Sequence, residues 1–303
     1  MKKYKNKITF IPKYLGLGLF MLLIAGTMNL FAQDSTVQVS KSSKPVKNTF
    51  NSVWIIDNQT VMVPIKGTFE ADFQHRFGTV NNGYDDFWGL FASSNIRLGV
   101  NYAPIDKLYL GVGITKFNMV WDFNAKYAIL QQTQDNSMPV SVTAFANMGI
   151  DTRDASNFRN TVDRFSYFSQ IMVARKFNDK FSAQVSPSLT WFNNVEAYVD
   201  SQGEIQNKMN NAHFAIAFMG RYRISDKFGL IANYDQPITE HFTNNPHPNI
   251  ALGIEVTTSS HAFQVFMGNY NAIVPQYNNM YNKNDFEDWQ FVIGFNITRL
   301  WNF

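Results

Sequence analysis

The chain ends in the stretch Asp288-Trp289-Gln290-Phe291-Val292-Ile293-Gly294-Phe295-Asn296-Ile297-Thr298-Arg299-Leu300-Trp301-Asn302-Phe303. Every second residue from Trp289 to Ile297 is aromatic or aliphatic, and the same parity continues after Arg299 with Trp301 and Phe303. The residues between them are mostly small or polar. A period of two, with one apolar and one polar face, is typical of a β-strand that separates two different environments.

A long terminal strand with a final aromatic residue resembles the closing strand of bacterial outer-membrane barrels. A barrel has no free edge, so this strand must pair with the first one. The first clear strand is residues 65–77, where apolar residues alternate with Lys, Glu, Asp and Arg. Four charges on one face would be costly against a dry core, so they indicate a wet lumen.

We count twelve alternating segments, an even number that places both termini at the periplasmic end. They are residues 65–77, 93–103, 107–117, 119–130, 140–150, 165–177, 180–192, 211–224, 227–235, 249–257, 261–270 and 288–303. Short turns, three of the form x-Asp-Lys-apolar, alternate with longer polar connections. The sequence therefore predicts an all-β protein, a closed antiparallel up-and-down transmembrane β-barrel of about twelve strands, with ten or fourteen as alternatives.

Three regions are predicted along the chain. Residues 1–32 carry five Lys residues and then an apolar run, as a cleaved signal peptide does; a single membrane-anchoring helix is the alternative. Residues 33–64 are an N-terminal linker and lead-in, and residues 65–303 are the barrel. Residues 50–64 contain two short apolar runs, which we interpret as an ordinary ordered lead-in; a leader that folds into the barrel mouth or along its periplasmic end is the alternative.

Composition excludes several functions. Aromatic residues make up 16% of the 303, yet mean hydropathy is only −0.21, which argues against a helical membrane protein. Without residues 1–32 the chain has 21 basic and 23 acidic residues, so its net charge of −2 gives no sign of nucleic-acid binding. The absence of cysteine excludes disulfides, thiol catalysis and thiolate metal sites.

Neither a catalytic nor a metal site is expected. No Gly-x-Ser-x-Gly motif is present, and Ser260 and His261, being neighbours, would face opposite sides of a strand. His241 and His247 in one loop, and the acidic cluster around Asp285 in another, lack the spacing of a calcium or zinc site. We expect no cofactor, and a cation at these loops is the alternative.

The lumen face is the remaining candidate site. By parity its charged residues are Lys66, Glu70, Asp72, Arg76, Arg97, Asp122, Lys126, Arg221, Arg223, Asp235 and Glu255. They predict an outer-membrane barrel that is a passive channel or binding barrel for small polar solutes. The alternative is a structural or adhesive barrel with a filled lumen and partner-binding external loops; an outer-membrane hydrolase is a remote one. Pairwise cancellation of the charges would favour a filled lumen.

Several motifs together resemble a family of Gram-negative outer-membrane β-barrels, domain of unknown function 5777. The resemblance covers about residues 50–303 and is carried by His75-Arg76-Phe77-Gly78, Phe87-Trp88-Gly89-Leu90, Asn95-Ile96-Arg97-Leu98-Gly99, Lys126-Tyr127-Ala128-Ile129-Leu130-Gln131, Met138-Pro139-Val140-Ser141-Val142, Ala174-Arg175-Lys176-Phe177, His261-Ala262-Phe263-Gln264 and Gly294-Phe295-Asn296-Ile297. It implies the fold and an outer-membrane location. It also implies that the barrel-assembly machinery reads the closing strand, with Trp301 and Phe303. We expect a monomer in outer-membrane lipid with no nucleic-acid partner.

Overall fold

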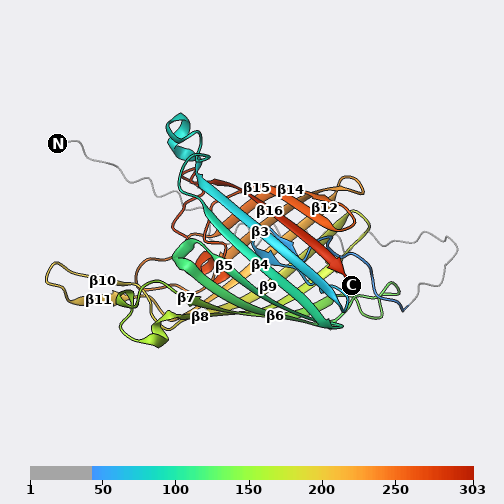
Figure 1. Cartoon of the computed structure of the whole chain (residues 1–303), viewed down its shortest axis with the longest axis horizontal. Helices are drawn as coiled ribbons and strands as arrows, with labels where there is room; N and C mark the ends of the chain where they lie inside the picture. The colour runs from blue at the N-terminus through green and yellow to red at the C-terminus, as the bar shows by residue number, and fades with distance from the viewer. Residues whose placement is uncertain (1–42) are drawn as a thin grey trace. The chain divides into compact units, whose positions relative to one another are not determined.

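Twelve antiparallel strands form one closed barrel in the computed structural model, which describes residues 43–303 (Figure 1). The strands are β3 (Thr68–Thr79), β4 (Asn95–Ile105), β5 (Leu108–Thr115), β6 (Val120–Leu130), β7 (Ser141–Asp151), β8 (Phe165–Lys176), β9 (Phe181–Phe192), β12 (Ala212–Arg223), β13 (Phe228–Pro237), β14 (Asn249–Thr257), β15 (His261–Gly268) and β16 (Val292–Asn302). The predicted fold class and strand count are confirmed. The predicted signal peptide lies outside the described residues.

The barrel closes where the last strand meets the first. Strand β16 pairs with β3 from Val292↔Thr79 to Asn302↔Thr68. The end of the barrel with the short turns is called the periplasmic end here, because outer-membrane barrels carry their short turns there. At this end of the seam the Asn302 side-chain amide donates to Thr68 Oγ1 at 3.0 Å, and the Trp301 and Phe69 rings lie 5.7 Å apart. The closing-strand assignment is therefore confirmed, although β16 begins at Val292 rather than at residue 288.

The two ends of the barrel differ in their connections. The x-Asp-Lys turns join strands at the periplasmic end, and Lys107 takes the left-handed conformation there, with φ 70°. The outer end carries longer loops with added elements. These are η1 (Val80–Asp86), η2 (Phe117–Met119), η3 (Ala155–Asn157), η4 (Thr161–Arg164), β10 (Ala197–Val199), β11 (Ile205–Lys208) and α2 (Pro275–Tyr281). Among the described residues, no helix is long and apolar enough to cross a membrane.

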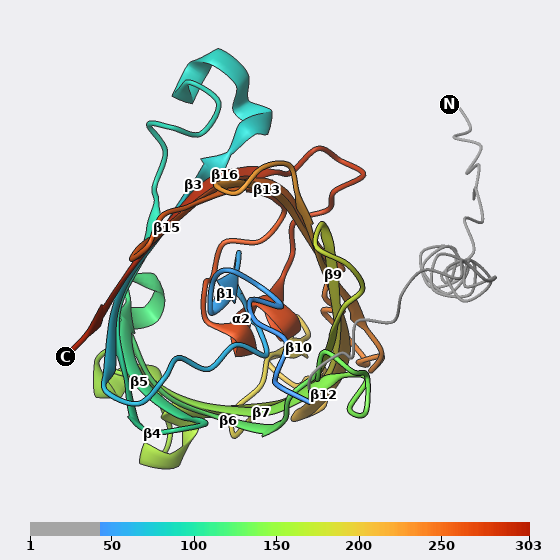
Figure 2. The same ribbon diagram turned by 90° about the vertical axis from the view of Figure 1, so that its right-hand side faces the viewer.

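Residues 49–61 of the lead-in lie inside the barrel. They form a small hairpin of β1 (Trp54–Ile55) and β2 (Asn58–Gln59), whose residues are all buried. In the end-on view β1 stands within the ring of strands, and so does α2 from the loop between β15 and β16 (Figure 2). Our interpretation of residues 50–64 as an ordinary lead-in was wrong, because their polar groups find partners on the lumen wall.

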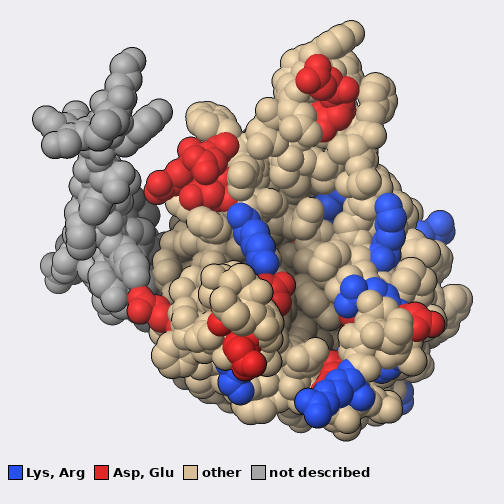
Figure 3. All heavy atoms as spheres, turned by 90° about the vertical axis from the view of Figure 1, so that its left-hand side faces the viewer, with Lys and Arg blue, Asp and Glu red and all other residues tan. Residues whose placement is uncertain are grey.

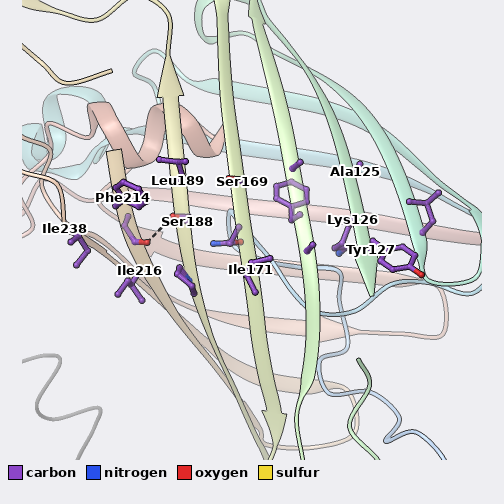
Figure 4. A pocket seen from close by; sticks show the side chains of 17 residues that line it. Ala125, Lys126, Tyr127, Ser169, Ile171, Ser188, Leu189, Phe214, Ile216 and Ile238 are labelled. Atoms are coloured by element: carbon purple, nitrogen blue, oxygen red, sulfur yellow. Dashed lines mark hydrogen bonds between the residues drawn. The ribbon is translucent and has the colours of Figure 1, made fainter. Parts of the chain in front are cut away.

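The outer wall is apolar and carries a broad depression of about 720 Å³ (Figure 4), with a smaller one of about 440 Å³ beside it on the same strands. Large outward side chains such as Tyr127, Ile171 and Phe214 border it, and small residues such as Ser169 and Ala125 form its floor. It crosses the strands that face lipid, so it is not an entrance to the lumen.

A pair of stacked histidines ties an outer loop to the wall. His213, on β12, and His241, in the loop after β13, have ring centroids 5.1 Å apart, and His213 Nδ1 lies 2.9 Å from His241 Nε2. The backbone N–H of Asn210 donates to His241 Nδ1 at 3.0 Å. Because that nitrogen accepts a hydrogen bond, His241 is neutral in this arrangement, and its Nε2–H donates to His213.

The closing strand yields a first prediction. Deleting Trp301-Asn302-Phe303 removes the last pairs of the seam and exposes backbone groups to lipid, at several kcal/mol each. The truncated protein should therefore be lost from the outer-membrane fraction, measured as the heat-modifiable band on a detergent gel. Deletion of residues 201–203, in the exposed turn between β10 and β11, is the matched control and should be tolerated. Normal outer-membrane levels of the truncated protein would contradict the assignment.

The histidine pair yields a pH prediction. Burial lowers the pKa of His241, so the loop tie is fully present above the ordinary histidine pKa of about 6.5 and weakens as pH falls below it. Hydrogen exchange of residues 238–248, corrected for intrinsic rates, should therefore accelerate between pH 7.5 and 5, by up to about tenfold per pH unit. His241→Phe should show a smaller change in corrected rate between the two values, because one of the two buried rings that titrate is gone. A wild-type loop without pH dependence would contradict the tie.

Candidate functional site

Nine of the eleven predicted lumen charges lie buried in the barrel interior. They are Glu70, Asp72, Arg76, Arg97, Asp122, Lys126, Arg221, Asp235 and Glu255. The other two lie at the periplasmic end. Lys66 is exposed before β3, and Arg223 is partly exposed at the end of β12, where it lies 3.6 Å from Asp226. Both keep the inward parity, but the barrel interior has already ended at their positions.

Arg97 is the centre of the most extensive charge network. Its Nη1 donates to Asp72 at 2.6 Å, and its Nε and Nη2 donate to the two oxygens of Asp122 at 2.8 and 2.9 Å. The guanidinium lies over Gly113, where an added Cβ would meet it at 2.2 Å. Gly113 therefore provides the recess that lets a full-length Arg side chain lie along the wall.

Two further arginines are also paired. Arg221 Nε donates to Glu255 at 2.5 Å, between β12 and β14. Arg76 pairs with Asp57 of the lead-in, and its guanidinium lies 4.4 Å from the centroid of the Phe266 ring. Asp57 also accepts from Asn278 of α2 at 3.0 Å. One lead-in carboxylate thus joins the wall, the lead-in and the outer loop.

Lys126 and Glu70 both bind the lead-in. Lys126 Nζ donates to Gln59 Oε1 at 2.7 Å, while the Trp54 indole N–H donates to Glu70 at 3.3 Å. Asp235 accepts from Asn58 of the lead-in at 2.9 Å. The wall charges therefore cancel one another or contact the lead-in, and they do not line a continuous wet face as the sequence had indicated.

Wall side chains also bind the backbone of the lead-in. Gln264 accepts from the N–H of Ile56 at 3.0 Å and donates to the carbonyl of Trp54 at 2.8 Å. Gln184 accepts from the N–H of Val61 at 2.9 Å. These glutamines satisfy lead-in peptide groups that would otherwise be buried without partners.

The lumen also contains an apolar cluster. Phe50, Ile55, Ile56 and Val61 of the lead-in pack into a cluster from six strands of the wall. The wall contributes Phe145, Phe168, Met172, Ala174, Met219, Ile231, Ala251 and Phe266. The sequence missed this cluster because strand parity separates the two faces of a sheet but does not distinguish a wet interior from a filled one.

Above the lead-in, α2 and the outer loops enclose a vestibule of about 530 Å³. Tyr277 packs edge-on against Phe192 with ring centroids 4.9 Å apart, and Gln276 donates to Asn147 on β7 at 2.7 Å. Basic and acidic side chains surround the hollow at this end of the molecule (Figure 3), among them the pair Lys283–Glu196 at 2.9 Å. The vestibule mixes aromatic rings with amides and paired charges.

The remaining predicted positions lie apart from the lumen. His75 is on the outer wall, stacked on Phe295 at 5.1 Å, while Arg76 points inward; Phe77 packs 4.3 Å from His75, and Gly78 lies against the loop that follows β3. Trp301 lies at the seam, and Phe303 follows β16.

The loop and turn histidines form small contacts of their own. His247 Nδ1 lies 3.5 Å from Asp285, which brings together two loops that we had considered separately. Within residues 43–303, no three His, Asp or Glu side chains are grouped to hold a metal ion. Ser260 Oγ lies 3.2 Å from His261 Nδ1, contrary to our expectation of opposite faces, because Ser260 belongs to the turn rather than the strand.

Comparison with solved structures gives outer-membrane barrels of low sequence identity. The NanC porin shares 9% identity over 78% of this chain and 99% of its own, with a TM-score of 0.49. The KdgM porin shares 8% over 76% and 98%, with a TM-score of 0.46, and an outer membrane channel from Pseudomonas putida F1 shares 13% over 79% and 97%, also at 0.46. No curated protein matches the sequence.

One family matches most of the chain. It is described as a membrane bound beta barrel domain (DUF5777), and the match runs over residues 50–301. The match includes residues 50–64 of the lead-in and reaches residue 301 in the last strand, so it spans the barrel, as the sequence resemblance implied. The chain belongs to this family of membrane-bound β-barrels.

Proposed function

We propose that this protein is an outer-membrane channel for small polar solutes and that the lead-in holds it closed. The observation that carries the proposal is how the lead-in is bound. Its hairpin pairs only with itself, and wall side chains hold it through hydrogen bonds to Gln184, Gln264 and Lys126. Water can replace neutral hydrogen bonds of this kind at a net cost of about 0.5–1.5 kcal/mol each, and separating the buried Asp57–Arg76 pair adds a larger cost. A strand of the barrel, in contrast, could not leave without opening the wall.

The layout of the interior supports a route along the barrel axis. The vestibule would receive a solute from outside, and both α2 and the lead-in lie inside the ring of strands (Figure 2). The Asn278–Asp57 contact connects these two obstacles. Displacement of either one would remove a partner of the other, so opening from one end would weaken the closure at the other end.

The proposal includes a location and a mode of action. A signal peptide in residues 1–32 would direct export, and the assembly machinery would insert a monomer into outer-membrane lipid. Transport through such a barrel needs no catalytic group and no cofactor, so we infer a non-enzymatic role.

A second candidate is a structural or adhesive barrel whose lumen stays filled. The guanidinium groups of Arg97, Arg76 and Arg221 are all paired with wall or lead-in carboxylates. This pairing favours the second candidate, because charges that neutralise one another can keep the lumen filled permanently. Channel recordings separate the two candidates.

The first channel prediction concerns removal of the lead-in. Deleting residues 50–63 takes away the hairpin and should give single-channel steps in planar bilayers under conditions where the full-length protein conducts rarely. The matched control is deletion of residues 201–203, which lie in the exposed outer turn. If the folded, heat-modifiable protein that lacks residues 50–63 gives no single-channel steps, the channel proposal is contradicted and the filled barrel is favoured.

The second prediction leaves the lead-in in place and fastens it. Asn58 on β2 donates to Asn233 on β13 at 2.6 Å, and the chain has no cysteine of its own. Asn58→Cys with Asn233→Cys, joined by a short thiol-reactive linker that a reductant cleaves, should abolish channel openings. Cleavage of the linker should restore them. Equal conductance before and after cleavage would show that the lead-in does not control the passage, and the single Asn58→Cys variant controls for the substitution.

A further inference from the structure

The loop between β3 and β4 carries four exposed aromatic side chains. Their exposed fractions are 78% for Tyr84, 40% for Phe87, 48% for Trp88 and 82% for Phe91. The rings contact one another, with centroid distances from 5.4 to 6.2 Å. We propose that this aromatic knob, residues 80–91, inserts into the outer-leaflet interface beside the barrel and anchors its outer rim to lipid.

The direction in which the knob projects distinguishes it from the β10–β11 hairpin, which belongs to another long loop. Both views show the loop that contains η1 standing out sideways from the wall at the outer end of β3 (Figures 1 and 2). The β10–β11 hairpin instead continues along the barrel axis and lies within the ring in the end-on view. A loop that projects sideways at the rim lies over the surrounding bilayer, whereas an axial hairpin extends away from it.

The backbone holds the knob in shape. Phe87, Trp88 and Gly89 are successive left-handed residues, with φ 53°, 55° and 80°, a conformation that non-glycine residues rarely adopt. Asp86 supports it by accepting from the N–H of Gly89 at 2.8 Å. The N–H of Gly78, at the end of β3, donates to the carbonyl of Gly89 at 3.0 Å, so the knob is fastened to the wall. These contacts therefore fix the position of the aromatic rings relative to the wall.

The knob continues the lipid-facing surface. Phe73, His75 and Phe77 form an outward aromatic row on β3 that leads up to it. The neighbouring loop adds Trp289, which is 73% exposed and lies 6.2 Å from Phe291. The N–H of Val80 donates to the carbonyl of Phe291 at 2.7 Å, which joins the two loops side by side.

The chemistry of the knob fits lipid at headgroup depth. Tyr and Trp combine an apolar ring with a polar group, and they concentrate where hydrocarbon meets water. Asp85 and Asp86 give the knob a negative charge, so attraction to anionic headgroups cannot hold it, and burial of the rings must. A partner protein or a second copy of the chain would also cover the rings, and the experiment below distinguishes these from lipid.

The test measures where the knob lies. Because the chain has no cysteine, Phe91→Cys can carry one nitroxide label in protein reconstituted into phospholipid vesicles. Tyr198→Cys on the axial β10 hairpin, 56% exposed, is the matched control. Collisions with oxygen report lipid, and collisions with a water-soluble nickel chelate report water. We expect the Phe91 label to favour oxygen several-fold more strongly than the Tyr198 label, with both variants heat-modifiable.

Two results would overturn the proposal. A Phe91 label as accessible to the nickel chelate as the Tyr198 label would place the knob in water. A label shielded from both reagents would place it against protein. A second label at Tyr84→Cys repeats the measurement at another ring of the knob, so a local effect of one substitution cannot decide the outcome. The result does not depend on whether the barrel conducts, because the label reports depth alone.

Discussion

Closure of the backbone is the constraint on which the rest of this structure depends. Each N–H and C=O that faces hydrocarbon must find a partner, because an unpaired group costs several kcal/mol there. The pairing of β16 with β3 meets this requirement for the last open edge. Everything else in the molecule follows from the cylinder that this seam completes: an inner surface to be filled, an outer surface to be apolar and two ends to be covered.

The inner surface is filled by charges that depend on each other. Removing one partner from a buried ion pair costs about 3–5 kcal/mol, although the intact pair adds little net stability. The ion pairs of Arg97 therefore add little net stability, but removing either of its two carboxylate partners would destabilise the barrel. Arg76 differs, because its carboxylate partner comes from the lead-in. The wall thus carries a cation whose compensation depends on a segment that is not part of the wall.

The sequence predicted the cylinder well and its contents poorly. Alternation along each strand indicated all twelve strands to within a few residues, since a strand with one lipid face must place apolar side chains at every second position. The same parity put Asp72 and Arg97 inside correctly. It could not show that Asp57, in a segment without alternation, would enter the lumen, because that contact joins residues far apart in the chain and depends on the diameter of the closed ring.

Some outer features were likewise invisible to periodicity. Trp289 has the apolar parity of β16, yet it stands in a loop with φ 59°, because the strand begins only at Val292. His213 has the inward parity of β12, but its stacking partner His241 lies in the loop after β13, which strand parity does not describe. Contacts between loops depend on which strands become neighbours, so they can be recognised only after the barrel is closed.

The order of the chain limits how the lead-in can move. It enters and leaves at the periplasmic end, because residues 64–67 connect it directly to the first residue of β3. Ahead of its buried residues, the N–H of Val46 donates to the carbonyl of Gln132, and Pro45 bridges to Thr133, in the connection between β6 and β7. The lead-in is therefore a loop fastened at both ends to the periplasmic rim. It can withdraw only toward that rim, and a force that acts on the chain before residue 45 would first have to break the bridge at Thr133.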